Sequence, residues 1–75
     1  MKLLAVFSES RETLQIAINQ EAVQGRPNVR CLELIERAGK VAIHGADSAV
    51  MAVIGRMQQF GHTGLLTVRP LTVQH

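Results

Sequence analysis

Few side chains in this sequence could do chemistry, and they stand apart from one another: Cys31, His44, Ser48 and His62. Metal ligands usually recur at short spacings such as CxxC or HxxxH, and neither spacing occurs here. No nucleophile-elbow sequence surrounds Ser48 or Cys31, so a helix-capping serine and an incidental thiol are favoured. The sequence therefore predicts no metal site, no cofactor and no enzyme, with histidines that are structural or lie at the surface.

One turn has the residue types of an anion or effector site, namely His44, Gly45, Asp47 and Ser48. These residues lead into a predicted helix, whose first backbone N–H groups can hold an anion. The carboxylate of Asp47 would occupy the same place, because it can cap the helix by accepting one of those hydrogen bonds. A capped helix is thus favoured over an anion site at this turn.

A second turn, formed by Arg37, Ala38, Gly39 and Lys40, carries two cations. Such a turn can line a binding site or a pore for anions. A solvated turn is the simpler interpretation, because isolated surface charges are common. What either turn can do depends on the elements that position it.

The first half of the chain predicts a strand and a helix. Residues 3–7 are a continuous apolar run, typical of a central strand that is buried on both faces. Ser8 or Ser10 caps the helix that follows, and Gly25 ends it. Ile16 and Val23 lie off the apolar stripe of this helix, which indicates a second contact surface.

The second half predicts three strands and a helix. Strands are expected at residues 28–36, 40–44 and 65–73, and Gly45 is expected to end the middle one. Asp47 or Ser48 is expected to cap the second helix, which ends near residue 61. Its apolar residues recur at helical spacing and form one stripe: Val50, Val53, Ile54, Met57 and Phe60.

The order βαββαβ and the residue types of the strands predict the same sheet. Charges in strand 28–36 and Pro70 in the last strand place these two at the edges, since proline cannot donate to the ladder. The apolar strands 3–7 and 40–44 are then central. We expect an α+β fold, a ferredoxin-like two-layer sandwich with an antiparallel four-stranded sheet and both helices on one face. The other face is either wet or covered by a neighbouring subunit.

Length and composition predict one small domain, residues 1–75, that assembles. Hydrophobic residues make up 47% of the 75 residues, and a single cysteine excludes an internal disulfide, so oligomerisation is the expected source of added stability. The net charge of +2 comes from scattered cations, which argues against nucleic acid. No stretch reaches the roughly 20 apolar residues of a membrane span. A lone thiol and an apolar start too short for a signal peptide predict a cytoplasmic location.

Residues 36–50, ERAGKVAIHGADSAV, resemble the bacterial microcompartment shell domain. That family has a glycine-bearing turn, a strand of alternating apolar residues, a Gly-Asp, and a helix beginning with a small residue and Ala-Val. The matching positions are Gly39, Val41, Gly45, Ser48, Ala49 and Val50. The chain departs from the pattern at the extra residue Ala46. The resemblance implies an oligomeric, non-catalytic shell subunit in which residues 37–40 line a central pore, assembled from this chain alone or with other small-domain subunits.

A different role belongs to ACT-type regulatory domains, which share the βαββαβ topology. Small effectors bind these domains where helices and strands of two subunits meet, and Gly45 and Asp47 would then be the contact turn. RNA-binding domains of this topology carry aromatic residues on the central strands, and Phe7 alone does not make such a platform. Self-assembly and effector binding therefore stay open as alternatives.

Overall fold

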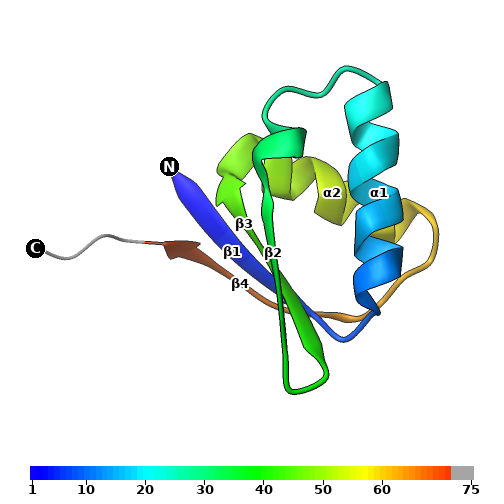
Figure 1. The fold of residues 1–75 in the computed structure, drawn as a ribbon, viewed down its shortest axis with the longest axis vertical. Coiled ribbons are helices and arrows are strands. Elements are labelled where there is room, and N and C mark those ends of the chain that lie inside the picture. Colours follow the sequence, from blue (N-terminus) through cyan, green and yellow to red (C-terminus); the bar gives the residue numbers. More distant parts are fainter. Residues whose placement is uncertain (72–75) are drawn as a thin grey trace, which may run out of the picture.

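Four antiparallel strands form one sheet, and two helices cover one of its faces (Figure 1). The computed structural model describes residues 1–71. Its elements in chain order are β1 (Lys2–Phe7), α1 (Arg11–Val23), the 3₁₀ turn η1 (Val29–Cys31), β2 (Glu33–Arg37), β3 (Lys40–Ala46), α2 (Asp47–Gln59) and β4 (Leu65–Leu71). The strand order is β2-β3-β1-β4. The predicted ferredoxin-like sandwich is therefore confirmed, with β1 and β3 central. Residues 72 and 73 of the predicted last strand lie outside the described residues.

The core lies between the sheet and the helices. β1 and β3 send alternate residues into it, Ala5, Phe7, Val41 and Ile43, as expected for strands with a period of two. Leu14 of α1 and the stripe of α2 meet them from the other side. Phe60 is the exception in the predicted stripe. It lies just past the end of α2 and is 59% exposed.

Residues 28–36 do not form one continuous strand. Asn28 adopts a left-handed conformation (φ 66°), which asparagine tolerates better than most residues, and the 3₁₀ turn η1 follows. This turn places Val29 fully inside the core, against α1 and α2. The strand begins only at Glu33, so β2 is a short edge strand.

Gly45 does not end the third strand, which continues to Ala46 and pairs Gly45 with Leu3. A Cβ at Gly45 would lie 2.7 Å from Cδ2 of Leu32, so the glycine is where Leu32 packs against the strand backbone. The helix then starts directly at Asp47, so its N-cap is Ala46, which makes no side-chain capping hydrogen bond, and the prediction that Asp47 or Ser48 holds the N-cap position is wrong. Oδ1 of Asp47 accepts the Ser48 N–H at 2.8 Å from within the first turn. In α1 the cap is Ser10, whose hydroxyl accepts the Thr13 N–H at 3.2 Å.

Candidate functional site

The sheet face without helices presents side chains in rows. Residues opposite each other on antiparallel strands point to the same face, so the pairing of the strands defines each row. One row contains Ile35, Ala42, Val6 and Thr67. The next contains Glu33, His44, Leu4 and Arg69. We call this surface the open sheet face.

The middle of the open sheet face is apolar. Leu4, Val6 and Ala42 are half-buried between their neighbours, and Ile35 on the edge strand is 47% exposed. β1 is apolar on both faces, which predicts burial on both. Only the helix side is covered, and so this strand lacks the second cover that its sequence predicts.

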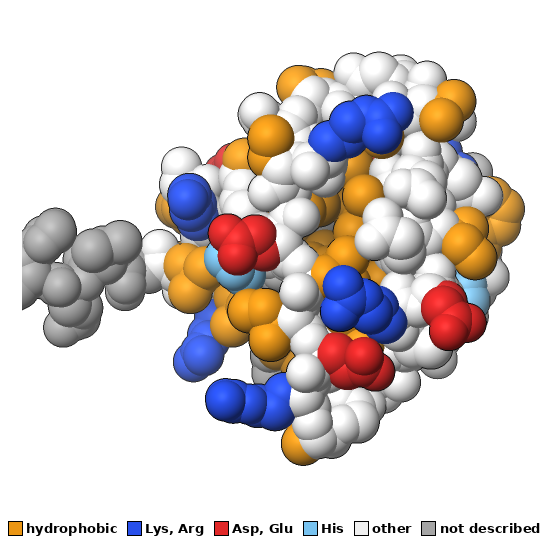
Figure 2. Space-filling model, viewed as in Figure 1, with side chains coloured by type: hydrophobic (Ala, Val, Ile, Leu, Met, Phe, Trp, Pro, Cys, Tyr) orange, Lys and Arg blue, Asp and Glu red, His pale blue; other side chains and the backbone are white. Residues whose placement is uncertain are grey.

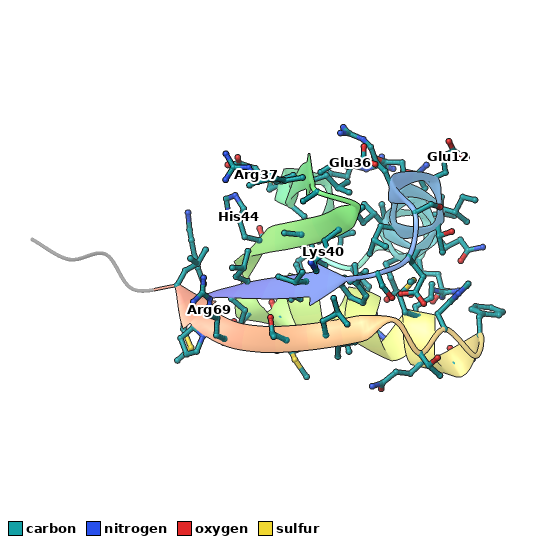
Figure 3. All side chains as sticks on the ribbon, turned by 90° about the horizontal axis from the view of Figure 1, so that it is seen from below. Glu12, Glu36, Arg37, Lys40, His44 and Arg69 are labelled. Carbon is teal, nitrogen blue, oxygen red and sulfur yellow. The ribbon has the colours of Figure 1, made fainter. Side chains whose placement is uncertain are left out.

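Cations surround this apolar floor. By the same pairing, Lys2, Arg37, Lys40 and Arg69 belong to the open sheet face. Figure 3 shows Arg37, His44 and Arg69 on the side of the strands away from the helices. Within residues 1–71, none of the four cations lies within ion-pair distance of an acid.

Glu33 is the one acid in these rows, and it is already paired. Its Oε2 lies 3.5 Å from Nε2 of His44, a contact that becomes an ion pair when the histidine is protonated. Figure 2 shows Lys and Arg side chains on the strand side of the molecule beside hydrophobic ones. The open sheet face is therefore an apolar floor with a positive rim.

The predicted turn 37–40 forms the tip of the β2–β3 hairpin, which projects from the body of the molecule (Figure 1). Arg37 and Lys40 pair as the last residues of their strands, so Ala38 and Gly39 alone make the turn. Both have positive φ, 54° and 76°, as in the tight type I′ hairpin turn. All four residues are exposed.

The other predicted turn is divided by the structure. His44 points to the open sheet face, whereas Gly45 is closed off by Leu32 on the opposite face. Asp47 and Ser48 lie at the start of α2 beside a shallow hollow of about 230 Å³, lined also by Met1 and Met51. The four residues are thus near in sequence but do not converge on one site.

Beyond the first turns of the helices, where Arg11, Glu12 and Asp47 are exposed, the outer surface of the helical layer exposes no charged residue. Every exposed residue from 13 to 24 on α1 is neutral: Gln15, Ile16, Asn19, Gln20, Val23 and Gln24. The same holds for the exposed residues from 48 to 60 on and just after α2: Ser48, Met51, Gly55, Gln58, Gln59 and Phe60. Exposed helix faces usually carry charge, so a neutral face of this extent indicates a contact surface.

A groove runs between the outer sides of α1 and α2. Its larger part, about 340 Å³, is lined by Ile16 and Phe60 among others, and its continuation by Val23, with Gln20 and Arg56 shared by both parts. Ile16, Val23 and Phe60 are exposed by 58%, 80% and 59%. We call this the α1/α2 groove. It confirms the sequence prediction that Ile16 and Val23 lie outside the core.

Arg56 in this groove is paired with a buried carboxylate. Glu21, only 5% exposed, pairs with Arg56 and, at 3.3 Å, with Arg26. The Arg56 guanidinium also lies 5.6 Å from the centre of the Phe60 ring, within cation–π range. The Arg56 side chain thus packs between the two helices and is not free to bind an anion.

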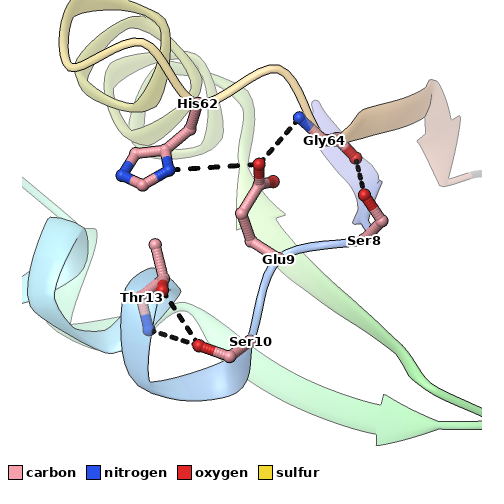
Figure 4. A network of polar contacts seen from close by, with 6 residues as sticks. All are labelled: Ser8, Glu9, Ser10, Thr13, His62 and Gly64. Atoms are coloured by element: carbon pink, nitrogen blue, oxygen red, sulfur yellow. Dashed lines mark hydrogen bonds and ion pairs between the residues drawn. The ribbon is translucent and has the colours of Figure 1, made fainter.

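A second polar cluster ties together the loops that precede α1 and β4 (Figure 4). Glu9 accepts the Gly64 N–H at 2.8 Å and lies 4.0 Å from Nδ1 of His62. The Ser8 N–H donates to the Gly64 carbonyl at 2.8 Å. These contacts hold the two loops together, and we call this cluster the loop clasp.

Metal-ligating side chains do not cluster. No three of the His, Cys, Asp and Glu side chains in residues 1–71 are placed to hold a metal ion. Cys31 lies exposed in η1. Neither helix in the described part of the chain has the length and apolar character needed to cross a bilayer.

Comparison of the chain with family models, with curated proteins and with solved structures gives no match.

Sequence reasoning missed the open sheet face as a charged surface. Its cations come from three separated segments, Lys2, residues 37–40 and Arg69, and only strand pairing brings them to one face. The neutral helical face was visible in the sequence as a run without exposed charge, once the buried position of Glu21 is known.

Proposed function

We propose that this chain is a non-catalytic subunit that assembles with copies of itself through the α1/α2 groove and the neutral helix surface around it. The observation that supports the proposal most strongly is three large exposed apolar side chains, Ile16, Val23 and Phe60, on a helix surface whose exposed charges lie only at the helix starts. A neighbouring copy can pack against this surface through apolar and neutral polar side chains, and in a ring it would do so through a different surface of its own. The open sheet face is unsuited to such a contact, because its cations would meet cations.

The assembly we favour is a ring with the β2–β3 hairpin tips at its centre. The shell-domain resemblance implies this position for Arg37, Ala38, Gly39 and Lys40. The projecting tip and its two exposed cations are in keeping with a pore for anions. Other small-domain subunits of the same kind could take places in such a ring.

The first experiment is the native mass by light scattering on a sizing column. We expect a mass near six times the 8.2 kDa subunit, or larger sheets. Ile16→Glu places a charge in the α1/α2 groove and should reduce the mass to that of the monomer. Ile35→Glu is the matched control, because it makes the same change at a similarly exposed isoleucine on the sheet face and should leave the mass unchanged. A monomeric wild type, or dissociation by Ile35→Glu alone, would overturn the proposal.

A crosslinking experiment tests the ring itself. Ala38→Cys in a Cys31→Ser background puts one thiol at the hairpin tip. If the tips meet at a central axis, oxidation should join subunits in pairs, and Gln58→Cys on α2 in the same background should give a different crosslinking pattern. If the assembly had the expected mass but gave no crosslink at residue 38, the proposed pore would be wrong and only self-assembly would stand.

The alternative is a regulatory module that binds a small effector at a subunit interface. The size of the α1/α2 groove, about 340 Å³, is in the range of small-molecule sites, and Gln20 and His62 give it polar groups. A dimer or tetramer whose melting temperature rises with one small metabolite would favour this role. A hexamer indifferent to metabolites would favour the ring.

A further inference from the structure

We propose that the open sheet face is a docking site for an acidic amphipathic helix of a partner protein. This site is separate from the self-assembly surface, because it lies on the opposite side of the sheet from the helical layer. Three features support the proposal: the apolar outer side of β1, the cations around it, and the width of the open sheet face.

The apolar residues in the middle of the open sheet face indicate that a partner covers them. Leu4 and Val6 alternate with core residues Ala5 and Phe7 along β1, so the strand is apolar on both sides. An antiparallel sheet with one wet face normally shows polar residues there. Ile35, Ala42 and Val6 instead stand next to one another in a single row across three strands.

The positive charge of the open sheet face favours an acidic partner. The open sheet face carries Lys2, Arg37, Lys40 and Arg69 with no acid of residues 1–71 in ion-pair distance, while its acid Glu33 lies beside His44. A second copy placed face to face would bring cations against cations. Carboxylates of a partner would instead meet these four side chains, and charge-assisted pairs of this kind also fix orientation.

The shape favours a helix. Four strands spaced by about 4.8 Å span roughly 14 Å between the outer strands, which accommodates a helix of about 10–12 Å diameter with its side chains. The apolar residues form the floor and the long cationic side chains the rim, so the partner would place leucine-like residues inward and carboxylates at its flanks. A bound helix would complete a three-layer arrangement.

Other anionic occupants fit less well. A membrane surface is penetrated by protruding apolar side chains, whereas Leu4, Val6 and Ala42 are half-buried in the sheet and only Ile35 of this apolar floor is exposed. Nucleic acid that binds an open sheet stacks on aromatic residues, and Phe7 is only 1% exposed in the core.

The test uses the full chain and a synthetic helical peptide of about 18 residues, roughly five turns, with leucines on one face and glutamates beside them. We expect it to bind, and a version with lysine in place of glutamate not to bind. Arg69→Glu and Ile35→Glu should each weaken binding by at least about tenfold. Arg11→Glu is the matched control on the helical side, where a negative charge in the first turn of α1 is tolerated.

Each other result overturns the proposal. Equal binding of a scrambled peptide, or equal loss with Arg11→Glu, would mean only general charge attraction. Tighter binding to phosphatidylserine vesicles or to poly(U) than to the peptide would assign the surface to a membrane or to RNA. If the peptide did not bind even at about 50 mM salt, where charge attraction is strong, the open sheet face would not be a site for an acidic partner. Circular dichroism of Ile35→Glu and Arg69→Glu shows that the variants are folded.

Discussion

Gly64 occupies a position where the backbone approaches a carboxylate. A Cβ at this residue would overlap the side chain of Glu9, which accepts the Gly64 N–H. The backbone of Gly64 also accepts the Ser8 N–H, so one glycine holds the two loops that lead into α1 and β4. Its role is close approach, because its φ is not in the left-handed region.

We predict that Gly64→Ala destabilises the fold by about 2 kcal/mol, because Glu9 must leave its charge-assisted hydrogen bond. Gly55→Ala is the matched control. Gly55 lies inside α2 with nothing within 4 Å of an added Cβ, and so alanine should stabilise the helix by about 1 kcal/mol. Urea unfolding at one fixed protein concentration measures both changes. Equal effects of the two substitutions would show that the loop clasp contributes nothing.

The turn of the β2–β3 hairpin has a strained backbone conformation. Its two-residue turn requires positive φ at both positions, which Gly39 adopts easily and Ala38 does not. Asparagine tolerates this conformation and is common at this place in type I′ turns.

We predict that Ala38→Asn raises the free energy of unfolding by about 0.5–1 kcal/mol by relieving this strain. Ala38→Val should have the opposite effect, since a β-branched side chain is poorly tolerated at positive φ. The midpoint of thermal unfolding, followed by circular dichroism, checks both. If Asn and Val behaved alike, the conformation of the turn would not be what limits the stability of the hairpin.

The elements were predictable from the sequence wherever one local signal decided them. Apolar runs made β1 and β3 central, and Pro70 and the charges of β2 placed the edges correctly. The prediction was wrong where tertiary packing decided. Val29 turns into the core through η1, and Gly45 serves the packing of Leu32 instead of ending β3. The open sheet face could not be predicted as a charged surface, because strand pairing, not sequence spacing, brings Arg69 near His44 and Leu4.

The two layers of the molecule differ in the side chains that they expose. Apart from the charges at the helix starts, the helical layer exposes apolar and neutral polar side chains, whereas the sheet exposes an apolar floor with a cationic rim. A subunit that assembles through the first surface keeps the second available. One chain of 75 residues can thus be part of an assembly and still hold a partner.

Because the two surfaces differ in charge, we predict that salt affects self-assembly and peptide binding differently. Contacts through the apolar side chains of the α1/α2 groove are not screened, so the native mass should stay constant between about 50 and 500 mM NaCl. Binding of the acidic peptide to the open sheet face should weaken over the same range by about tenfold or more, because its exposed charge pairs are screened. Light scattering and fluorescence anisotropy on the same samples measure both. Dissociation of the assembly by salt would show that charged residues hold the subunits together, and would point to the hairpin cations and the sheet in place of the helical layer.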